Sequence, residues 1–538
     1  MSKPKVLRPK PEFTLDQDAS SPLYQQLFER LRAQILTGRL EARTRLPSTR
    51  VLAGTLGVSR TTTARAYEQL LLEGFVESKV GDGTRVACLQ SEQLFQLAGR
   101  QDEPSAEDRD ASPATAVSQR TQALLDLPRP EDAVANQASL GTCPFPVGQP
   151  DVASFPYTTW ARLVARAARR SLESVAQYEH MQGYGPLRQA IAAHIGVARG
   201  VHCSAEQVIV TSGSQGALDL IARVLLDAGD PAWIEDPGYT GARGALLAAG
   251  ARPVPVPVDR EGIDVAHGRA VCPSARLAIV TPSHQFPTGV TMSLSRRLAL
   301  LDWARAADAW IVEDDYDSEY RFSGRPLEAL HGLDSAGRVL YVGTFSKVLF
   351  PSLRVGYVVA PPMLLGGLIA ARRFIDIHPP LLEQLALVDF MNEGHFVRHV
   401  RKMRDIYAER RNALVDALTR ELGGELDVVV PEAGIHLATW MSEDTSIPPT
   451  TLRTVAQRLN ILRASQLSVR PLHRDGLLLG FASAVPEQLR ANVHMLARAL
   501  AGHAHDVVTP LSCQSPGTPK SRSRDQHRGS EDLRGVGS

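Results

Sequence analysis

The sequence has little cysteine and no long hydrophobic run. Five cysteines are spread over 538 residues and none forms a CxxC pair, which argues against a disulfide framework and against a zinc site. No apolar run reaches the length of about 18 residues that crosses a membrane, and the basic first residues lack the apolar segment of a secretion signal. We therefore expect a cytoplasmic protein with no membrane contact.

The chain also lacks net charge. Its formal charge is +1 at pH 7, so composition as a whole gives no sign of a nucleic-acid partner, and any basic surface has to be local. Hydrophobic residues make up 43% and charged residues 22% of the chain, values typical of a globular protein. The length allows two or more domains with a large buried core.

Changes in composition divide the chain into parts. Helical periodicity alternating with turn signals predicts a first domain over residues 20–88. Residues 89–140 are poor in aromatic residues and rich in Gln, Asp, Ser, Ala and Pro. We expect a flexible linker there, because such a segment buries too little apolar surface to offset its ordering entropy. A second domain is expected over 141–502 and a disordered polar tail over 503–538.

The second domain alternates apolar runs with helical stretches. Because the runs are apolar on both faces and separated by helices, they predict an α/β architecture with a mainly parallel sheet covered on both sides. The predicted strands lie within residues 207–213, 232–238, 276–282, 309–315, 338–344 and 355–361.

Two helices joined by a glycine-containing turn are expected in the first domain. Ser48 can cap a helix that ends at Leu56, Gly57 supplies the turn, and Ser59 can cap a second helix. This is a helix-turn-helix, and the following "FVESKVGDGTRV" predicts a β-hairpin, or wing. The second helix begins "RTTT", so the side chains at positions 60–63 would project toward base edges in a major groove.

Basic residues gather in this first domain. Residues 22–88 contain ten Arg and Lys against six Asp and Glu, an excess that suits contacts with phosphates. The alternative is a small helical domain used for dimerisation, with its arginines on a solvated face.

The stretch "LPSTRVLAGTLGVSRTTTARAYEQLLLEGFVESKVGDGTRV" resembles the winged helix-turn-helix of GntR-type transcription regulators along its whole length. The resemblance implies binding to double-stranded operator DNA. Ala64 departs from the pattern, because better-known members often carry another arginine there. The operator contacts that the resemblance implies are Arg50, Ser59, Arg60, Thr61 and Thr62.

Several motifs of the second domain follow predicted strands. Lys347 in "GTFSKVLFPSLR" comes just after one, with Arg354 seven residues later. The motif "TSGSQG" is a strand end, a turn and a helix start, whose free N–H groups suit an anion. "EDDYDSE" ends a strand in Asp314 and Asp315, and Tyr239 follows another strand in "EDPGYTG".

These parts suit a cofactor that carries an aldehyde, a phosphate and a pyridine ring. Such a cofactor needs a nucleophilic amine, an anion cradle, a carboxylate at the ring nitrogen and an aromatic ring to stack on it. All the parts fall at the carboxyl ends of strands, where α/β sheets bind ligands. Taken alone, the acidic motif could instead be a solvated loop or a divalent-metal site.

The ordered motifs "TSGSQGALDL", "EDPGYTGAR", "TPSHQFPTG", "IVEDDYDSEYR" and "GTFSKVLFPSLRVGY" resemble fold-type-I aminotransferases of the pyridoxal-phosphate superfamily over roughly residues 145–500. With the winged domain in front, the chain is similar to MocR-type regulators, a GntR subgroup that fuses the two domains. The resemblance implies pyridoxal 5'-phosphate bound as a Schiff base (aldimine) to Lys347. It also implies a homodimer in which Tyr184 reaches the partner's site.

The resemblance assigns further cofactor contacts. Asp314 rather than Asp315 would face the pyridine nitrogen, a choice that strand parity cannot make. Tyr316 would bond the phenolic oxygen and Tyr239 would stack on the ring. The phosphate contacts that it implies are Ser214, Gln215, Ser346 and Arg354.

Two departures from the aminotransferase pattern bear on activity. Phe286 stands where an asparagine contacts the cofactor's oxygen, and His284 or Gln285 could substitute for it. The strand within 474–483 has leucines where an arginine for the substrate carboxylate is expected; Arg463 and Arg470 are nearby candidates.

The sequence favours a DNA-binding transcription regulator whose second domain senses pyridoxal phosphate or an amino compound. An active aminotransferase with an appended DNA-binding module is the alternative, and the missing strand arginine argues against it. A third possibility is a domain that has lost the cofactor and only dimerises. The intact set of Lys347, Asp314 and Arg354 argues against that.

Overall fold

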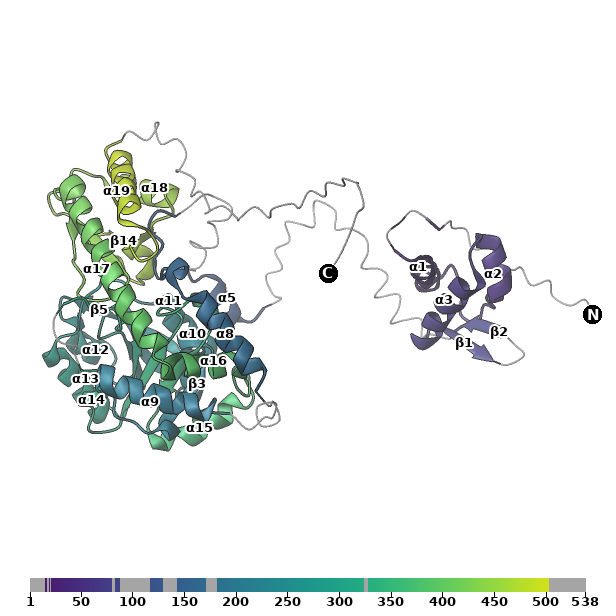
Figure 1. Ribbon diagram of the computed structural model, residues 1–538, viewed down its shortest axis with the longest axis horizontal. Helices are drawn as coiled ribbons and strands as arrows, with labels where there is room; N and C mark the ends of the chain where they lie inside the picture. Colours follow the sequence, from purple (N-terminus) through teal and green to yellow (C-terminus); the bar gives the residue numbers. More distant parts are fainter. Residues whose placement is uncertain are drawn as a thin grey trace, which may run out of the picture. The chain divides into compact units, whose positions relative to one another are not determined.

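A computed structural model describes residues 15–16, 19, 21–79, 83–87, 117–128, 143–170, 181–323 and 328–502. The chain forms two compact units that meet in sequence between Ala116 and Val117, and Figure 1 labels some of the elements of both. The units are described separately. No helix in these ranges is long and apolar enough to cross a bilayer.

The helix-turn-helix predicted for the first unit is confirmed. The Ser48 hydroxyl accepts a hydrogen bond from the Val51 amide at the start of α2, and Gly57 ends that helix in the left-handed conformation with φ of 67°. The Ser59 hydroxyl accepts from the Thr62 amide at the start of α3. The helices are α1 (Leu23–Leu36), α2 (Thr49–Leu56) and α3 (Arg60–Leu72).

The predicted wing is also present. Strands β1 (Val76–Lys79) and β2 (Gly83–Val86) pair antiparallel, with Val76 opposite Val86. Their turn lies outside the described residues. Both valines are buried in the core that the three helices and the hairpin share, so the hairpin is held to α3 by apolar contacts.

One side chain predicted to face DNA faces the core. Thr63 is completely buried, because it lies one and two helical turns before the buried Tyr67 and Leu70 and therefore shares their face. Arg60 and Thr61 are exposed, as expected. The prediction that all of positions 60–63 project outward is wrong at Thr63.

The second unit is built on an eight-stranded, mainly parallel sheet in the order β3-β10-β9-β8-β7-β4-β5-β6, which confirms the predicted architecture. Strands β4, β5, β7, β8 and β9 run parallel, whereas β10 is antiparallel to both of its neighbours. The strands are β3 (Val208–Thr211), β4 (Pro231–Asp236), β5 (Arg252–Asp259), β6 (Gly262–Ile263), β7 (Leu277–Val280), β8 (Trp310–Asp315), β9 (Val339–Thr344) and β10 (Gly356–Val359).

Strand β5 was not predicted, because its sequence "RPVPVPVD" has a proline at every second position. Proline donates no backbone hydrogen bond and is normally excluded from central strands. Here the three prolines share one parity, so their missing donors all point to the same side of the strand. The other side pairs with β4 from Arg252 to Pro257, whereas β6 covers only Val258 and Asp259.

Helices cover the sheet, and a second, antiparallel sheet completes the unit (Figure 1). The small sheet has the order β11-β12-β14-β13, and the long helix α17 packs against α19 beside it. Its strands are β11 (Leu426–Val428), β12 (His436–Met441), β13 (Leu462–Arg463) and β14 (Gly476–Gly480). The helices of the unit, including four-residue α14, are α5 (Gln119–Leu125), α8 (Tyr157–Ala168), α9 (Gly185–Arg199), α10 (Gly213–Leu225), α11 (Thr240–Ala249), α12 (Val265–Val271), α13 (Leu294–Ala306), α14 (Leu330–Leu333), α15 (Pro362–Arg372), α16 (Leu381–Asn392), α17 (His395–Leu422), α18 (Pro449–Arg458) and α19 (Pro486–Leu500).

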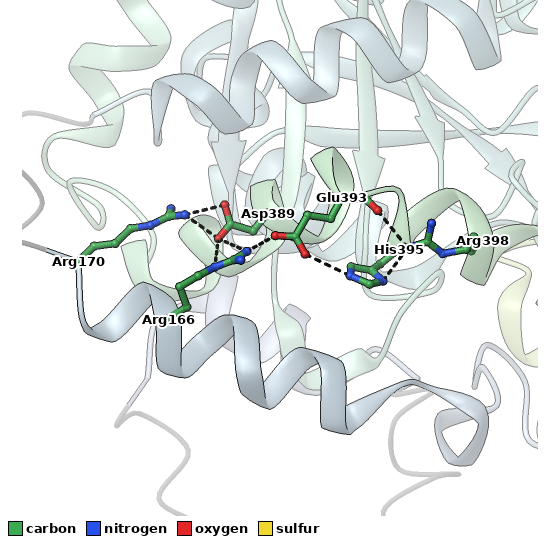
Figure 2. Close-up of polar contacts among 6 residues, drawn as sticks. All are labelled: Arg166, Arg170, Asp389, Glu393, His395 and Arg398. Carbon is green, nitrogen blue, oxygen red and sulfur yellow. Dashed lines mark hydrogen bonds and ion pairs between the residues drawn. The ribbon is translucent and has the colours of Figure 1, made fainter.

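A surface ion-pair network joins α8 to α16 and to the start of α17 (Figure 2). Arg166 on α8 and Arg170, just after that helix, both contact Asp389 on α16, with nitrogen–oxygen distances of 2.8 and 2.7 Å. Arg166 also pairs with Glu393, which contacts His395. Because solvent screens exposed pairs, the network orients the helices more than it stabilises them.

The predicted linker contains an ordered helix. Of residues 89–140, the structure describes 117–128, and α5 within them packs on α11. A Cβ on Gly244 would lie 3.5 Å from Leu127 and 3.9 Å from Leu124. Leucines of α5 and of the residues just after it therefore pack on α11 at a position that has no side chain. The linker prediction is therefore wrong for this helix, and the predicted tail, 503–538, lies outside the described residues.

Candidate functional site

The antiparallel insertion of β10 brings three predicted motifs together. Gly356 at the start of β10 pairs with Thr211 at the end of β3 and with Thr344 at the end of β9. The chain just before Gly356 therefore lies beside the start of α10 and beside the loop after β9. In this way Arg354 reaches the neighbourhood of Gly213, which the sequence places 141 residues earlier.

An anion cradle results at the N-terminus of α10. The Arg354 guanidinium donates to the Ser212 carbonyl over 2.8 Å, and a Cβ on Gly213 would lie 3.2 Å from that guanidinium. Ser212 precedes α10 without capping it through its side chain, so the first amides of the helix stay available to an anion. Ser214 and Gln215 lie in this first turn.

Ser346 and Lys347 lie in the loop that follows β9. The Ser346 hydroxyl is buried and has no hydrogen-bond partner among the described residues, which is costly unless a ligand supplies one. The Lys347 ammonium donates to the Gly148 carbonyl over 2.9 Å. A side chain at Gly148, which has φ of 74°, would require the ammonium to move, because a Cβ would lie 2.9 Å from that nitrogen.

The two adjacent carboxyls at the end of β8 differ in their surroundings. Asp315 accepts hydrogen bonds from Arg199 Nε at 2.7 Å and from the Tyr341 hydroxyl at 2.6 Å. Asp314 is equally buried, but its Oδ1 has no partner among the described residues. Burial, followed by the charges of Asp315 and Glu235, raises the pKa of Asp314 to about 7, while Lys347 lowers it.

Tyr239 lies beside the cradle. It precedes α11, and its hydroxyl donates to Gln215 Oε1 over 3.2 Å. Gln215 in turn donates to the Gly241 carbonyl. The ring of Tyr239 meets Phe286 edge to face, with 6.1 Å between centroids.

Tyr316 contacts His284. Its hydroxyl donates to the His284 carbonyl over 3.0 Å and lies 3.1 Å from His284 Nδ1. Gln285 donates to Glu235 and to two carbonyls and accepts from Thr288, so its amide is fully used. Of the two candidates to replace the asparagine, only His284 contacts Tyr316 directly.

The arginines proposed for a substrate carboxylate are already paired. Arg463 contacts Asp475 at 2.6 Å and Arg470 contacts Asp236 at 3.0 Å. Strand β14 is completely buried, and its three leucines are core residues. A carboxylate would have to displace an existing ion pair to use either arginine.

Arg243 is a residue that the sequence analysis missed. It is half-buried on the first turn of α11, four residues after Tyr239, and forms no side-chain hydrogen bond or ion pair with the described residues. Burial lowers the pKa of this guanidinium, although the Asp236 charge opposes that change. The four-residue spacing in "GYTGAR" is the signal that could have placed it beside Tyr239.

The residues predicted to contact DNA lie on or next to the two helices of the first unit. Arg50 and Arg60 are exposed near the starts of α2 and α3. The hydroxyls of Ser59 and Thr62 are 2.8 Å apart, so both take part in the cap of α3. Thr61 is exposed between them.

Comparisons with known proteins agree with the two-part organisation. Residues 145–499 match the model of the family "Aminotransferase class I and II", and residues 23–86 match "Bacterial regulatory proteins, gntR family".

Relatives span most of the chain. The "Probable rhizopine catabolism regulatory protein MocR" of Rhizobium meliloti is 42% identical over 92% of this chain and 97% of its own length. The "Uncharacterized HTH-type transcriptional regulator YdeL" of Bacillus subtilis is 34% identical over 79% and 85%.

A solved structure resembles the second unit. The α-aminoadipate aminotransferase LysN of Thermus thermophilus, in complex with N-(5'-phosphopyridoxyl)-L-leucine, matches with a TM-score of 0.64 and 30% identity. The match covers 72% of this chain and 98% of that one.

The raised pKa of Asp314 has a testable consequence for stability. In the unfolded chain an aspartate has a pKa of about 3.9, so wild-type stability should fall as the pH rises from about 4 to about 7, because the unfolded carboxyl ionises over this range while the buried carboxyl keeps its proton. We expect Asp314→Asn to stabilise the cofactor-free protein by about 1–3 kcal/mol above neutral pH and by less in acid. Chemical denaturation across this pH range measures the difference.

Asp315→Asn is the matched control. This change leaves Arg199 buried with a neutral partner, so it should destabilise the protein. An Asp314→Asn variant that is less stable than the wild type at every pH would contradict the assignment.

Proposed function

This chain belongs to the MocR-type transcription regulators, gntR-family proteins that carry an aminotransferase class I and II domain, and we propose that its second domain holds pyridoxal phosphate at Lys347 and senses that cofactor or an amino compound. The first unit binds DNA through its helix-turn-helix. The observation that carries the proposal is the pair of buried polar groups, Asp314 Oδ1 and Ser346 Oγ, that no described residue satisfies.

The residues of the site fit pyridoxal phosphate. The α10 N-terminus, Arg354 and the unsatisfied Ser346 hydroxyl together suit a phosphate. Asp314 suits a protonated pyridine nitrogen, because an opposite charge would offset the cost of burying its carboxylate. The aminotransferase in complex with a phosphopyridoxyl compound supports the same ligand class.

Each side chain has a distinct task in this proposal. The bound cofactor supplies an aldehyde and an electron-withdrawing ring. Lys347 is the amine that captures the aldehyde, and Asp314 holds the proton on the ring nitrogen. Tyr239 stacks on the ring and Tyr316 donates to the phenolic oxygen. Ser214, Gln215, Ser346 and Arg354 bind the phosphate.

Arg243 is the group best suited to an acidic part of the effector. A half-buried guanidinium without a partner costs free energy, and a carboxylate would lower that cost through a charge-assisted bond. Arg243 lies one turn from Tyr239, so an amine that reaches the cofactor could extend an acidic group toward it.

An active aminotransferase is the second candidate, favoured by the complete set of Lys347, Asp314 and Arg354. The sensor is better supported, because Arg463 and Arg470 are held by Asp475 and Asp236 and substrate orientation would suffer. Sustained transfer of an amino group from donor to keto acid would favour the enzyme.

We also propose a homodimer. Two winged units would then bind paired half-sites on one operator. Tyr184, half-buried at the start of α9, is the residue that we expect to reach the partner's site.

The cofactor proposal predicts a coloured protein. The full chain should gain a visible absorption band with pyridoxal phosphate, and Lys347→Ala should lose it, because the covalent link is gone. Lys402→Ala, at an exposed lysine on α17, is the control and should keep the band. A wild type that stays colourless with added pyridoxal phosphate refutes the proposal.

The role of Arg243 can be tested with two amines that differ in one group. We expect Arg243→Gln to weaken the spectral response of the cofactor-loaded protein to β-alanine by about tenfold, the effect of one charge-assisted bond. Its response to 3-aminopropan-1-ol should not change. Arg223→Gln, on the exposed face of α10, should alter neither. Equal losses for both amines would exclude a carboxylate contact.

DNA recognition depends on the exposed start of α3 in our proposal. Arg60→Ala should lose about 1–3 kcal/mol of discrimination between the operator and unrelated DNA. Arg39→Ala, an exposed arginine between α1 and α2, should mainly weaken the binding of both. Footprinting and competition binding at fixed salt measure this, and unchanged protection by Arg60→Ala would remove Arg60 from the contact set.

A further inference from the structure

Tyr316, His284 and Asp317 form a hydrogen-bonded chain whose direction can be worked out. The Tyr316 hydroxyl has one proton and donates it to the His284 carbonyl. Its oxygen can therefore only accept from His284 Nδ1, 3.1 Å away. The same nitrogen lies 3.2 and 3.1 Å from the two Asp317 oxygens, which accept when ionised. His284 therefore carries its proton on Nδ1.

A glycine, Gly434, packs directly against the imidazole of His284 and the carboxylate of Asp317. Gly434 has φ of 90°, and a Cβ there would lie 2.1 Å from His284 Cε1 and 2.7 Å from an Asp317 oxygen. Any side chain at Gly434 would displace the imidazole or the carboxylate. His284 and Asp317 are almost completely buried, so the pair is fixed by packing as well as by its hydrogen bonds.

Because of Phe286, the hydrogen bonds among Tyr316, His284 and Asp317 matter for cofactor binding. It contacts the rings of Tyr239, Tyr316 and His436 edge to face, but its side chain has no hydrogen-bond donor. Gln285 is fully used elsewhere. Aminotransferases place a second donor, beside the tyrosine, on the cofactor's phenolic oxygen. Neither Phe286 nor Gln285 can supply that donor here.

We propose that, with the cofactor bound, Tyr316 turns its proton from the His284 carbonyl to the cofactor's phenolic oxygen, and that His284, oriented by Asp317, is a positioning residue that donates to the Tyr316 oxygen and thereby strengthens that bond. Hydrogen bonds in a chain polarise one another, so a donor into the tyrosine oxygen makes its O–H a better donor. This inference rests on the proposed binding of pyridoxal phosphate at Lys347.

The expected consequence is a shift in a protonation equilibrium. With the cofactor bound, the nitrogen that Lys347 contributes would share its proton with the phenolic oxygen, so a strong donor on that oxygen would favour loss of the proton. Weakening the donor should raise the pH at which the visible band changes. The charged and titratable groups around this region are Glu235 on β4, Asp314 and Asp315 on β8, Asp317 and His284 in the loops, His436 on β12 and Lys347 itself.

Burial keeps the tyrosine protonated in this environment. Burial, and then the charges of Asp317 and Asp314, raise the pKa of Tyr316 well above its ordinary value. Its hydroxyl therefore acts as a donor throughout the pH range in which the cofactor band is measured.

Two nearly isosteric replacements test the inference. In the full chain loaded with pyridoxal phosphate, His284→Leu should raise the midpoint of the visible pH titration by about one unit, in the direction of Tyr316→Phe. His284→Asn can place an N–H where Nδ1 lies and should stay within about 0.3 unit of the wild type. Asp317→Asn should shift the midpoint less than His284→Leu but in the same direction.

The possible results distinguish a failure of this inference from a failure of the proposed cofactor binding. A wild type that never gains the band refutes cofactor binding. If His284→Leu binds the cofactor and titrates like the wild type, or if the Leu and Asn variants shift equally, the positioning role of His284 is refuted. If His284→Leu does not fold, an Asp317→Asn variant with the wild-type midpoint refutes it.

The same side chains could instead bind a metal ion. His284, Asp317 and His436 each offer a ligand atom within 4.8 Å of the others, and both histidines have an Nε2 without a partner among the described residues. Metal analysis of the purified chain before and after dialysis against a chelator decides this. Stoichiometric zinc whose removal moves the midpoint would overturn the hydrogen-bonded chain.

Discussion

Gly356 lies where β10, β9 and the first residue of α10 approach so closely that no side chain fits. A Cβ at this position would lie 2.7 Å from the carbonyl carbon of Gly213 and 2.9 Å from the oxygen of Gly343. This contact lets β10 run antiparallel between β3 and β9. It also delivers Arg354, in a left-handed conformation with φ of 51°, to the N-terminus of α10. The anion cradle at the start of α10 depends on this close approach.

The site buries several carboxyl groups near only a few cations, and this imbalance determines its electrostatics. Asp315 is neutralised by Arg199 and bonded by Tyr341, whereas Asp314 is buried with an oxygen that no described residue satisfies. An arrangement of this kind lowers stability and is found where a ligand completes it. The same reasoning applies to Ser346 and to the guanidinium of Arg243. These three groups, which have no partner among the described residues, are the ones that the cofactor or the effector would contact in our proposal.

The sequence predicted most of the fold because local rules and global structure agree. Ser48, Gly57 and Ser59 cap and end their helices as expected, and the buried parallel strands were recognisable as apolar runs. Strand β5 was not predicted, because its prolines disfavour a strand. The strand is explained only once its pairing with β4 on one side is known. Thr63 and helix α5 were misjudged for a related reason: tertiary contacts, absent from local composition, decide which face of a helix is buried and whether a polar segment docks.

Parts of the site could not be read from the sequence for a physical reason. The choice between Asp314 and Asp315 depends on Arg199 and Tyr341, which lie far away in the chain and meet only in the folded unit. Gly148 and Gly434 likewise act through contacts over long sequence separations. Motif spacing locates a lysine, a carboxyl and an arginine, whereas the partner of each becomes visible only when the strands are assembled.

We propose that one chemical event at Lys347 is linked to DNA binding in the other unit. The most direct test titrates the full chain with pyridoxal phosphate and follows the visible band and the operator affinity in the same samples. We predict that both change with one midpoint in the wild type, and that operator affinity no longer responds in Lys347→Ala, since linkage requires the ligand to favour one arrangement over another. An operator affinity that stays constant while the band saturates, with pyridoxal phosphate and then with amino compounds, would contradict the account.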